Sequence, residues 1–258
     1  MRRLVLLTVV AVLALTVGIA YAVTDTLTYT GTGSHKGRPS TKKPANFSYT
    51  GTLSVDTNPP GLQPDVAPST SVYFAKGIKR NGAYFPFCNQ SEIDGMPTFP
   101  AKCNKAVVGT GTATAYAGQP GGDRTQSITE TLNVKAVNGP KGKALWLVLN
   151  STPTAPVAIT NRIVPGTIVA SSGAFAFLVR FDIPANLQEP VPGVKVALAY
   201  FKVSISGSPR TVTIKHKKAK VSYLQLTSCK GKMSVKAIST FDDNGTPTPV
   251  TSTSSGKC

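Results

Sequence analysis

Residues 84–117 read YFPFCNQSEIDGMPTFPAKCNKAVVGTGTATAYA. This stretch holds Cys88 and Cys103, which are two of the four cysteines, with aromatic residues before the first and a run of small residues after the second. The small residues over residues 107–117 are typical of a β-strand that another layer or a bulky aromatic side chain approaches closely. The stretch therefore predicts a disulfide-closed corner of an all-β domain.

A secretory signal occupies the N-terminus. Residues 1–3 contain two arginines, residues 4–20 form an almost uninterrupted apolar run, and residues 20–22 read AYA, which matches the small-residue cleavage pattern. We predict cleavage after Ala22 and a mature domain over residues 23–258, in a secreted or extracytoplasmic location. The alternative is an uncleaved membrane anchor, because the apolar run is as long as the shortest spanning helices.

Export by cleavage is checked on the mature protein. Material recovered from the culture medium should begin at Val23, which N-terminal sequencing would show. Protein recovered only from membranes, with Met1 still in place, would rule out cleavage and favour the anchor.

The four cysteines predict two disulfides. An exported chain with an even number of cysteines forms disulfides in its oxidising compartment. Of the three possible pairings, we predict Cys88–Cys103 and Cys229–Cys258, because each pair brackets one local unit. No Cys-x-x-Cys spacing occurs, which argues against a zinc site. The sequence predicts no metal and no cofactor.

Short segments separated by turn residues run through the mature chain. About a dozen strands and no helix after the signal indicate an all-β fold, which we predict to be a single β-sandwich-like domain over residues 23–258. Three prolines make residues 183–193 a crossing loop. The predicted strands cover residues 24–31, 47–55, 71–75, 109–117, 125–137, 144–149, 158–163, 167–170, 174–181, 194–205, 211–214, 220–226 and 233–241, with a last strand that ends at Cys258.

Two segments add detail to this framework. Residues 27–32 read LTYTGT and residues 47–52 read FSYTGT, so we predict two similar strands joined by a basic loop over residues 33–44. Residues 144–149 read ALWLVL and are apolar on both faces, which predicts a central strand. Trp146, the one tryptophan, is expected to be a core anchor and not a platform for sugars.

Three parts of the chain share a pattern with other proteins. They are an F-x-x-C…C…V-G-x-G-x-A corner at residues 85–88, Cys103 and residues 108–113, then residues 183–188, and the segment from Tyr223 to the terminal Cys258. At these positions the chain resembles a set of uncharacterised secreted proteins of high-GC Gram-positive bacteria. The resemblance implies export, two local disulfides and a β-rich fold, and it carries no known active site.

Residues suited to catalysis are scarce. The two histidines, His35 and His216, lie among cations and have no carboxylate close in sequence, as a nucleophile and base pair would need. Most of the 11 acids lie in turns, a position that suits Asp. Residues 242–245 read DDNG and lack the spaced ligands of a calcium loop. We therefore predict no catalytic residue and expect a protein that is not an enzyme.

Positive charge has the clearest functional interpretation. The chain carries 28 Lys and Arg against 11 Asp and Glu, a net charge of +17. The predicted binding residues for an anionic envelope polymer or lipid surface are Lys215, Lys217, Lys218 and Lys220, in a turn between two strands. The alternative is that lysines on loops and edge strands serve solubility and block edge pairing. Specific nucleic-acid recognition is not expected, because few of these cations are arginines and no aromatic residues alternate with them.

Three functions remain open. We predict an exported, non-enzymatic structural or interaction module at the cell envelope or outside the cell. The alternatives are a secreted hydrolase with an unrecognised site and a carrier that holds an apolar ligand. A well-packed interior with basic rims would favour the module, and a carboxylate pair or a histidine–acid contact in a cleft would favour the hydrolase. A large apolar cavity lined by Phe175, Phe177 and Trp146 would favour the carrier.

Overall fold

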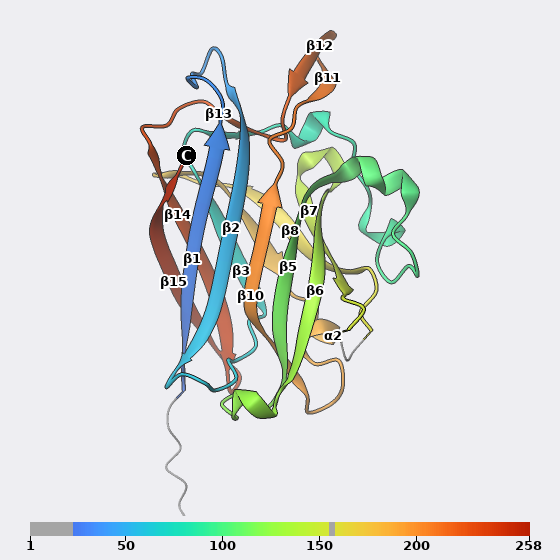
Figure 1. The fold of residues 1–258 in the computed structure, drawn as a ribbon, viewed down its shortest axis with the longest axis vertical. Coiled ribbons are helices and arrows are strands. Elements are labelled where there is room, and N and C mark those ends of the chain that lie inside the picture. The colour runs from blue at the N-terminus through green and yellow to red at the C-terminus, as the bar shows by residue number, and fades with distance from the viewer. Residues whose placement is uncertain (1–22, 155–157) are drawn as a thin grey trace, which may run out of the picture.

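The computed structural model describes residues 23–154 and 158–258, which are mostly β-strands (Figure 1). The strands are β1 (Thr24–His35), β2 (Ala45–Asn58), β3 (Ser69–Ala75), β4 (Ile78–Arg80), β5 (Val107–Gly118), β6 (Ile128–Asn138), β7 (Ala144–Ser151), β8 (Arg162–Ala170), β9 (Phe175–Asp182), β10 (Lys195–Ile205), β11 (Arg210–Ile214), β12 (Lys217–Val221), β13 (Leu224–Leu226), β14 (Lys232–Asp243) and β15 (Thr246–Lys257). The helical pieces are η1 (Gly82–Tyr84), η2 (Gln90–Glu92), η3 (Ala101–Ala106), η4 (Arg124–Gln126), η5 (Pro140–Gly142) and α2 (Ala185–Gln188). No helix in this described part of the chain has the length and apolar character needed to cross a membrane. The all-β prediction is confirmed.

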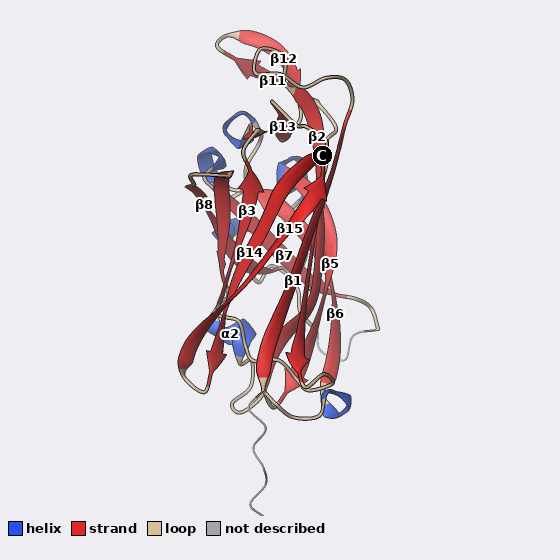
Figure 2. Cartoon of the chain, turned by 90° about the vertical axis from the view of Figure 1, so that its left-hand side faces the viewer, coloured by secondary structure: helices blue, strands red, loops and turns tan. Residues whose placement is uncertain are grey.

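The main sheet closes on itself. It has 13 strands in the order β1-β15-β14-β3-β9-β8-β7-β6-β5-β10-β2-β13-β4. Because β1 also pairs with β2 along its whole length, the eleven strands other than β13 and β4 form a closed, barrel-like sheet (Figures 1 and 2). Closure gives edge strands a partner and so removes their unpaired backbone groups. The finer prediction of a β-sandwich stays a prediction.

We call the junction where the first strand, β1, meets the last strand, β15, the seam. β1 and β15 run parallel there and pair at one position. Two glycines allow this approach, since a Cβ atom on Gly256 would overlap the carbonyl oxygen of Gly31. Serine side chains of β15 continue the seam: the backbone N–H of Tyr29 donates to Ser252 Oγ at 2.8 Å, and Ser254 Oγ donates to the carbonyl of Tyr29 at 2.8 Å.

The two ends of the barrel are covered in different ways. We call the upper end the one that carries the β11–β12 hairpin and the loop of residues 36–44, and the lower end the opposite one (Figure 1). β13 pairs with β2 and β4 near the upper end and buries Leu224 and Leu226 there. Two connections cross the lower end, residues 59–68 between β2 and β3 and residues 183–194 between β9 and β10, because neither pair of strands is adjacent in the sheet.

The disulfide-closed stretch packs on the outer face of β6, β7 and β8. Cys88 and Cys103 are joined, with Cα atoms 5.5 Å apart, and form a buried cluster with Val148 of β7 and its neighbours. Trp146 packs against this cluster, and its Nε1 donates to the carbonyl of Cys88 at 2.9 Å. β7 is therefore covered on both faces, by the barrel interior and by this corner, which confirms its prediction as a central strand.

The similar segments of β1 and β2 are related by a local two-fold axis. Gly31 lies opposite Gly51 in the antiparallel ladder, so the axis at this pair relates Tyr29 to Tyr49. Each tyrosine ring extends diagonally over the glycine of the other strand, and a Cβ at either glycine would collide with a tyrosine hydroxyl. The repeated sequence thus builds one symmetric tyrosine pair inside the barrel.

Some predicted boundaries differ from the structure. β1 continues to His35, so the basic loop covers residues 36–44 and not 33–44. The strand can extend through Gly33 because a glycine there leaves room for the ring of Phe47. The predicted strand over residues 220–226 is two strands, β12 and β13. The crossing loop contains the short helix α2, which was not predicted; Pro184 precedes its first residue, where a proline does not interrupt the helix.

The C-terminal disulfide joins the start of β14 to the chain end. Cys229 and Cys258 are paired, with Cα atoms 6.4 Å apart. Both disulfide pairings therefore agree with the prediction, and disulfides are compatible with an extracytoplasmic location.

Candidate functional site: an apolar cavity in the closed sheet

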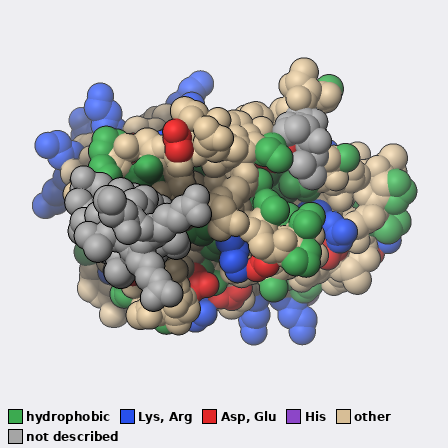
Figure 3. Space-filling view, turned by 90° about the horizontal axis from the view of Figure 1, so that it is seen from below, with side chains coloured by type: hydrophobic (Ala, Val, Ile, Leu, Met, Phe, Trp, Pro, Cys, Tyr) green, Lys and Arg blue, Asp and Glu red, His purple; other side chains and the backbone are tan. Residues whose placement is uncertain are grey.

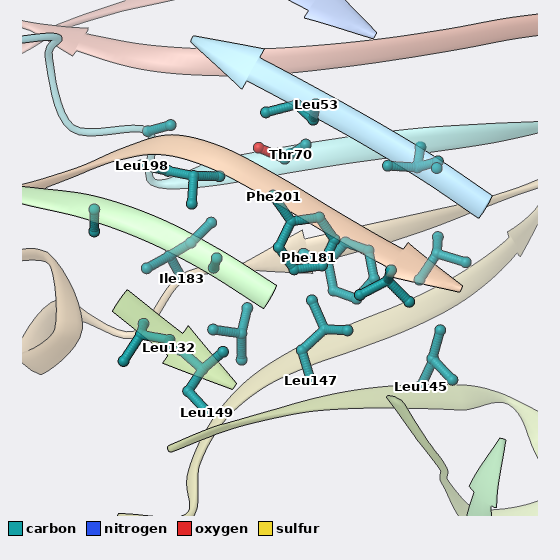
Figure 4. Close-up of a pocket in the computed structure, with 18 of the residues that line it drawn as sticks. Leu53, Thr70, Leu132, Leu145, Leu147, Leu149, Phe181, Ile183, Leu198 and Phe201 are labelled. Carbon is teal, nitrogen blue, oxygen red and sulfur yellow. The ribbon is translucent and has the colours of Figure 1, made fainter. Parts of the chain in front are cut away.

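An apolar cavity of about 190 Å³ lies inside the closed sheet. The strands alternate between inward and outward side chains, so β7 contributes three inward leucines at alternate positions. Figure 4 shows the rings of Phe181 and Phe201 beside these leucines. The cavity residues labelled there are Leu53, Thr70, Leu132, Leu145, Leu147, Leu149, Phe181, Ile183, Leu198 and Phe201.

The few polar side chains of the lining bond to protein partners. Among the described lining residues, only Tyr29, Tyr49 and Thr70 carry side-chain oxygens. The two tyrosine hydroxyls lie 2.6 Å apart, and Thr70 Oγ1 lies 2.9 Å from Ser239 Oγ. Burial raises the pKa of Tyr49 to about 12 and that of Tyr29 well above its usual value, so both hydroxyls are neutral. The cavity therefore offers shape and apolar contact and no charged group.

Toward the lower end the lining of the cavity is less buried. Five lining residues from this end, Ile159, Ile183, Leu187, Val196 and Leu198, are only half-buried although they are aliphatic. They come from the segment before β8, from the β9–β10 connection with α2, and from the start of β10. Seen from below, hydrophobic side chains reach the surface beside both acidic and basic ones (Figure 3). We call these five residues the mouth.

The three aromatic residues whose presence around a cavity would have favoured a carrier do not line this one. Trp146 lies on the outer face against the disulfide corner, and Phe175 packs edge-on against Tyr73 at 5.3 Å. Phe177 is buried in the same core but stacks on Phe74, with ring centroids 4.7 Å apart. The inward alternation of side chains along β7 instead brings Leu145, Leu147 and Leu149 to the lining.

The four predicted binding lysines all lie on or beside one hairpin strand. Lys215 is in the two-residue turn, with φ of 46°, and Lys217, Lys218 and Lys220 are on β12. All four are exposed. In the β11–β12 register Lys218 and Lys220 share one face, while Lys217 lies on the other face with Ile214. The hairpin is at the upper end and contributes no residue to the cavity.

Charge is distributed unevenly between the two ends. The acids near the lower end are Asp25, Asp56, Asp65, Asp123, Glu130, Asp182, Glu189, Asp242 and Asp243. Several cations of that end pair with them, such as Arg180 with Asp182 at 2.9 Å. The loop of residues 36–44 and the hairpin put many of the cations at the upper end. The mouth thus lies at the acidic end.

One buried carboxyl stands out among these acids. Asp25 points inward from β1 with 7% of its surface exposed, and its Oδ1 accepts from the backbone N–H of Asp65 at 3.2 Å. Burial is the main cause that raises its pKa to about 6, and the charges of Asp65 and Asp243 add to it. Asp65 itself has a raised pKa, mainly through burial and the nearby charges of Asp243 and Asp242. The hydrogen bond from Asp65 to Asp25 joins the connection of residues 59–68 to β1.

Among the described residues, no histidine and no acid lines the cavity. His216 is exposed in the hairpin turn, and His35 lies at the end of β1. In the described part of the chain, the one compact group of potential metal ligands is Cys88, Cys103 and Glu92. Its two sulfurs are joined in the disulfide, so the group is not a metal site.

Comparisons of this chain with protein-family models, with curated proteins and with solved structures find no match.

Proposed function

We propose that this protein is an exported, non-enzymatic binding protein that holds a small apolar molecule inside its closed sheet. The observation that carries the proposal is the apolar cavity with paired polar groups and a half-buried aliphatic mouth. Apolar pockets with few polar groups are the usual sites for small ligands. Water gains few partners in such a cavity, so an apolar ligand meets little competition there.

The size of the cavity limits the ligand. An apolar protein cavity of about 150 Å³ binds benzene, and this one has about 190 Å³. A one-ring or compact two-ring hydrocarbon, or the end of an acyl chain that enters through the mouth, therefore suits the available space. Because the tyrosine and threonine hydroxyls already have partners, a polar headgroup would stay outside.

The small volume of the cavity also constrains the shape of the barrel. A circular barrel leaves an interior just wide enough for side chains at about eight strands, and wider barrels enclose larger spaces. Here the closed sheet has more strands than that and a small cavity, so we propose that it is flattened. Two packed faces joined at their edges would then correspond to the predicted sandwich. The grouping with secreted proteins of high-GC Gram-positive bacteria and the signal peptide stay predictions.

Binding is tested with a variant that fills the cavity. Ala113 lines the cavity with 2% of its surface exposed, and Ala113→Leu places an isobutyl group inside. We expect the affinity for a small apolar fluorescent dye, measured by titration, to fall by about tenfold or more, since the ligand loses its space. Thr112→Leu adds similar bulk on the exposed face of the same strand and should bind like the parent.

Two outcomes would contradict the proposal. One is a parent protein that binds no apolar probe of this size. The other is Ala113→Leu binding the dye as tightly as Thr112→Leu does, while both variants keep the parent's unfolding midpoint.

A second function is supported by the hairpin. Its four lysines, Lys215, Lys217, Lys218 and Lys220, are exposed, and no ion pair within the described residues includes them. We propose that they contact an anionic envelope polymer or lipid surface, as free cations at a surface gain about 1 kcal/mol each near an anionic membrane.

Replacing these four lysines by Gln tests the contact. Exposed substitutions shift the free energy of unfolding by only about 0.5 kcal/mol, so the variant should fold normally. Its retention on purified cell wall or anionic liposomes at low salt should fall, as measured by co-sedimentation. If the variant is retained as well as the parent, the hairpin serves solubility and this second function is wrong.

A further inference from the structure

Two separate basic features protrude from the upper end. One is the loop of residues 36–44, with Lys36, Arg38, Lys42 and Lys43, all exposed. The other is the β11–β12 hairpin, and both extend beyond the barrel in Figures 1 and 2. No acid occurs in either segment. We call these two segments the basic tips.

A hollow at the same end carries more positive charge. It has a volume of about 350 Å³ and lies between the end of β3 and the segment around Cys229. Lys76, Lys230 and Lys232 line it, and no acid does. Because the acids gather at the lower end, positive potential from the tips and the hollow adds up without local cancellation.

The composition of the tips favours a flexible polymer over a bilayer. Proteins that lie on membranes insert Trp, Phe or Leu side chains below the headgroups. None of the exposed large apolar residues of the described chain belongs to the basic tips, and Tyr84, in η1 beside β11, is one that lies next to them. Two raised tips also present an uneven surface, which a flexible chain can follow.

We infer that the upper end is a docking face for a flexible polyanion of phosphate type, and that docking holds the mouth of the cavity away from the polymer. The inference extends the proposed hairpin contact to the loop and the hollow, and it adds an orientation. The acid-rich lower end is repelled by the same polymer, so attraction and repulsion both favour one end-on arrangement. A ligand would then exchange with the medium while the protein stays attached.

The affinity for long-chain inorganic polyphosphate tests the docking face. If about six cations neutralise phosphates, raising the salt from 50 to 200 mM should weaken binding by about 300-fold. The variant Lys36→Gln, Lys42→Gln, Lys43→Gln removes three charges from the loop and should weaken binding by about tenfold at 100 mM salt, with a shallower salt dependence.

A matched control removes three charges elsewhere. Arg162→Gln, Arg180→Gln, Lys195→Gln changes the net charge equally but acts at the lower end, where two of these cations already pair with acids. Its affinity for polyphosphate should stay within about twofold of the parent's, since the three positions lie at the end opposite the basic tips and exposed charges far apart are largely screened at this salt. Equal losses in both variants would show attraction by net charge and overturn the docking face.

Lysine footprinting tests the orientation. Acetylation with and without polyphosphate, read by mass spectrometry, should show protection of Lys36, Lys43, Lys218 and Lys230 and none of Lys195. Protection of Lys195 equal to that of the tips would overturn the end-on arrangement.

Two further outcomes separate this inference from the functions it extends. If the hairpin variant loses binding and the loop variant does not, the hairpin contact stands and the extended face is wrong. Tighter retention on phosphatidylglycerol vesicles than on polyphosphate would overturn the choice of a polymer. Dye binding by the cavity is measured separately and does not depend on either result.

Discussion

Asp25→Asn is expected to raise the free energy of unfolding at pH 8 by about 2–3 kcal/mol. The carboxyl is 7% exposed, and its pKa in the folded protein is about 6 against 3.8 for an ordinary Asp, chiefly because burial disfavours the charged form. One unit of pKa corresponds to about 1.36 kcal/mol. Asparagine keeps an oxygen that accepts from the N–H of Asp65 and removes the buried charge.

The contribution of Asp25 to the free energy of unfolding changes with pH in a defined direction. Between pH 3.8 and about 6 the folded protein keeps a proton on Asp25 that the unfolded chain has released. The contribution of this group to stability is therefore complete below pH 3.8 and is lost as the pH rises through 6. Urea unfolding of parent and variant at pH 4, 6 and 8 should show a difference that grows with pH and levels off above pH 7.

A control with the opposite shift accompanies this experiment. Asp123 is an exposed cap whose pKa is lowered by hydrogen bonds from Thr125, so Asp123→Asn should not gain stability as the pH rises. If Asp25→Asn is no more stable than the parent at pH 8, the carboxyl is not held in an unfavourable charged state.

Gly256→Val is expected to lower the free energy of unfolding by about 3 kcal/mol. A Cβ at this position would overlap the carbonyl oxygen of Gly31 across the seam, and its neighbours include the side chain of Val235. Overpacking of a filled interior costs about 1–3 kcal/mol, and a backbone atom cannot move aside as a side chain can. The valine would separate β1 from β15 or move both strands.

Ser255→Val is the matched control. It adds a branched side chain to the same strand at an exposed position, where substitutions change stability by about 0.5 kcal/mol or less. Urea unfolding midpoints and dye binding should separate the two variants. Equal stability of Gly256→Val and Ser255→Val would mean that the seam is looser than the structure shows.

Local patterns in the sequence predicted much of the framework. The disulfides follow from cysteines that bracket local units, and β7 follows from a run that is apolar on both faces. The small residues of β5 predicted close approach by another layer or a bulky aromatic; the element that comes close is instead its neighbour in the same sheet, β10, since a Cβ on Gly109 or Gly111 would meet the β10 backbone. These features depend on short segments of chain, which is why they were visible.

Closure of the sheet and the site within it were not visible in the sequence. Closure depends on the pairing of β1 with β2 and β15, and no pattern within one strand reveals its partner at long range. The cavity needs inward residues from many strands, so Leu147 and Phe201 are ordinary core residues until the strands are placed around them. To predict the separation of charge between the two ends, one must also know the direction of each strand, because acidic and basic segments follow one another along the chain.

The seam between β1 and β15 has a consequence for how fast the protein folds. The strands that meet there are separated by nearly the whole chain, and the hydrogen bonds from Tyr29 to Ser252 and Ser254 span more than 220 residues. Folding rates fall as contacts become less local, since the entropy of closing a long loop is lost before the contacts form. Closure of the seam should therefore be a late, slow step, and until it occurs β1 and β15 each present an open edge to other molecules.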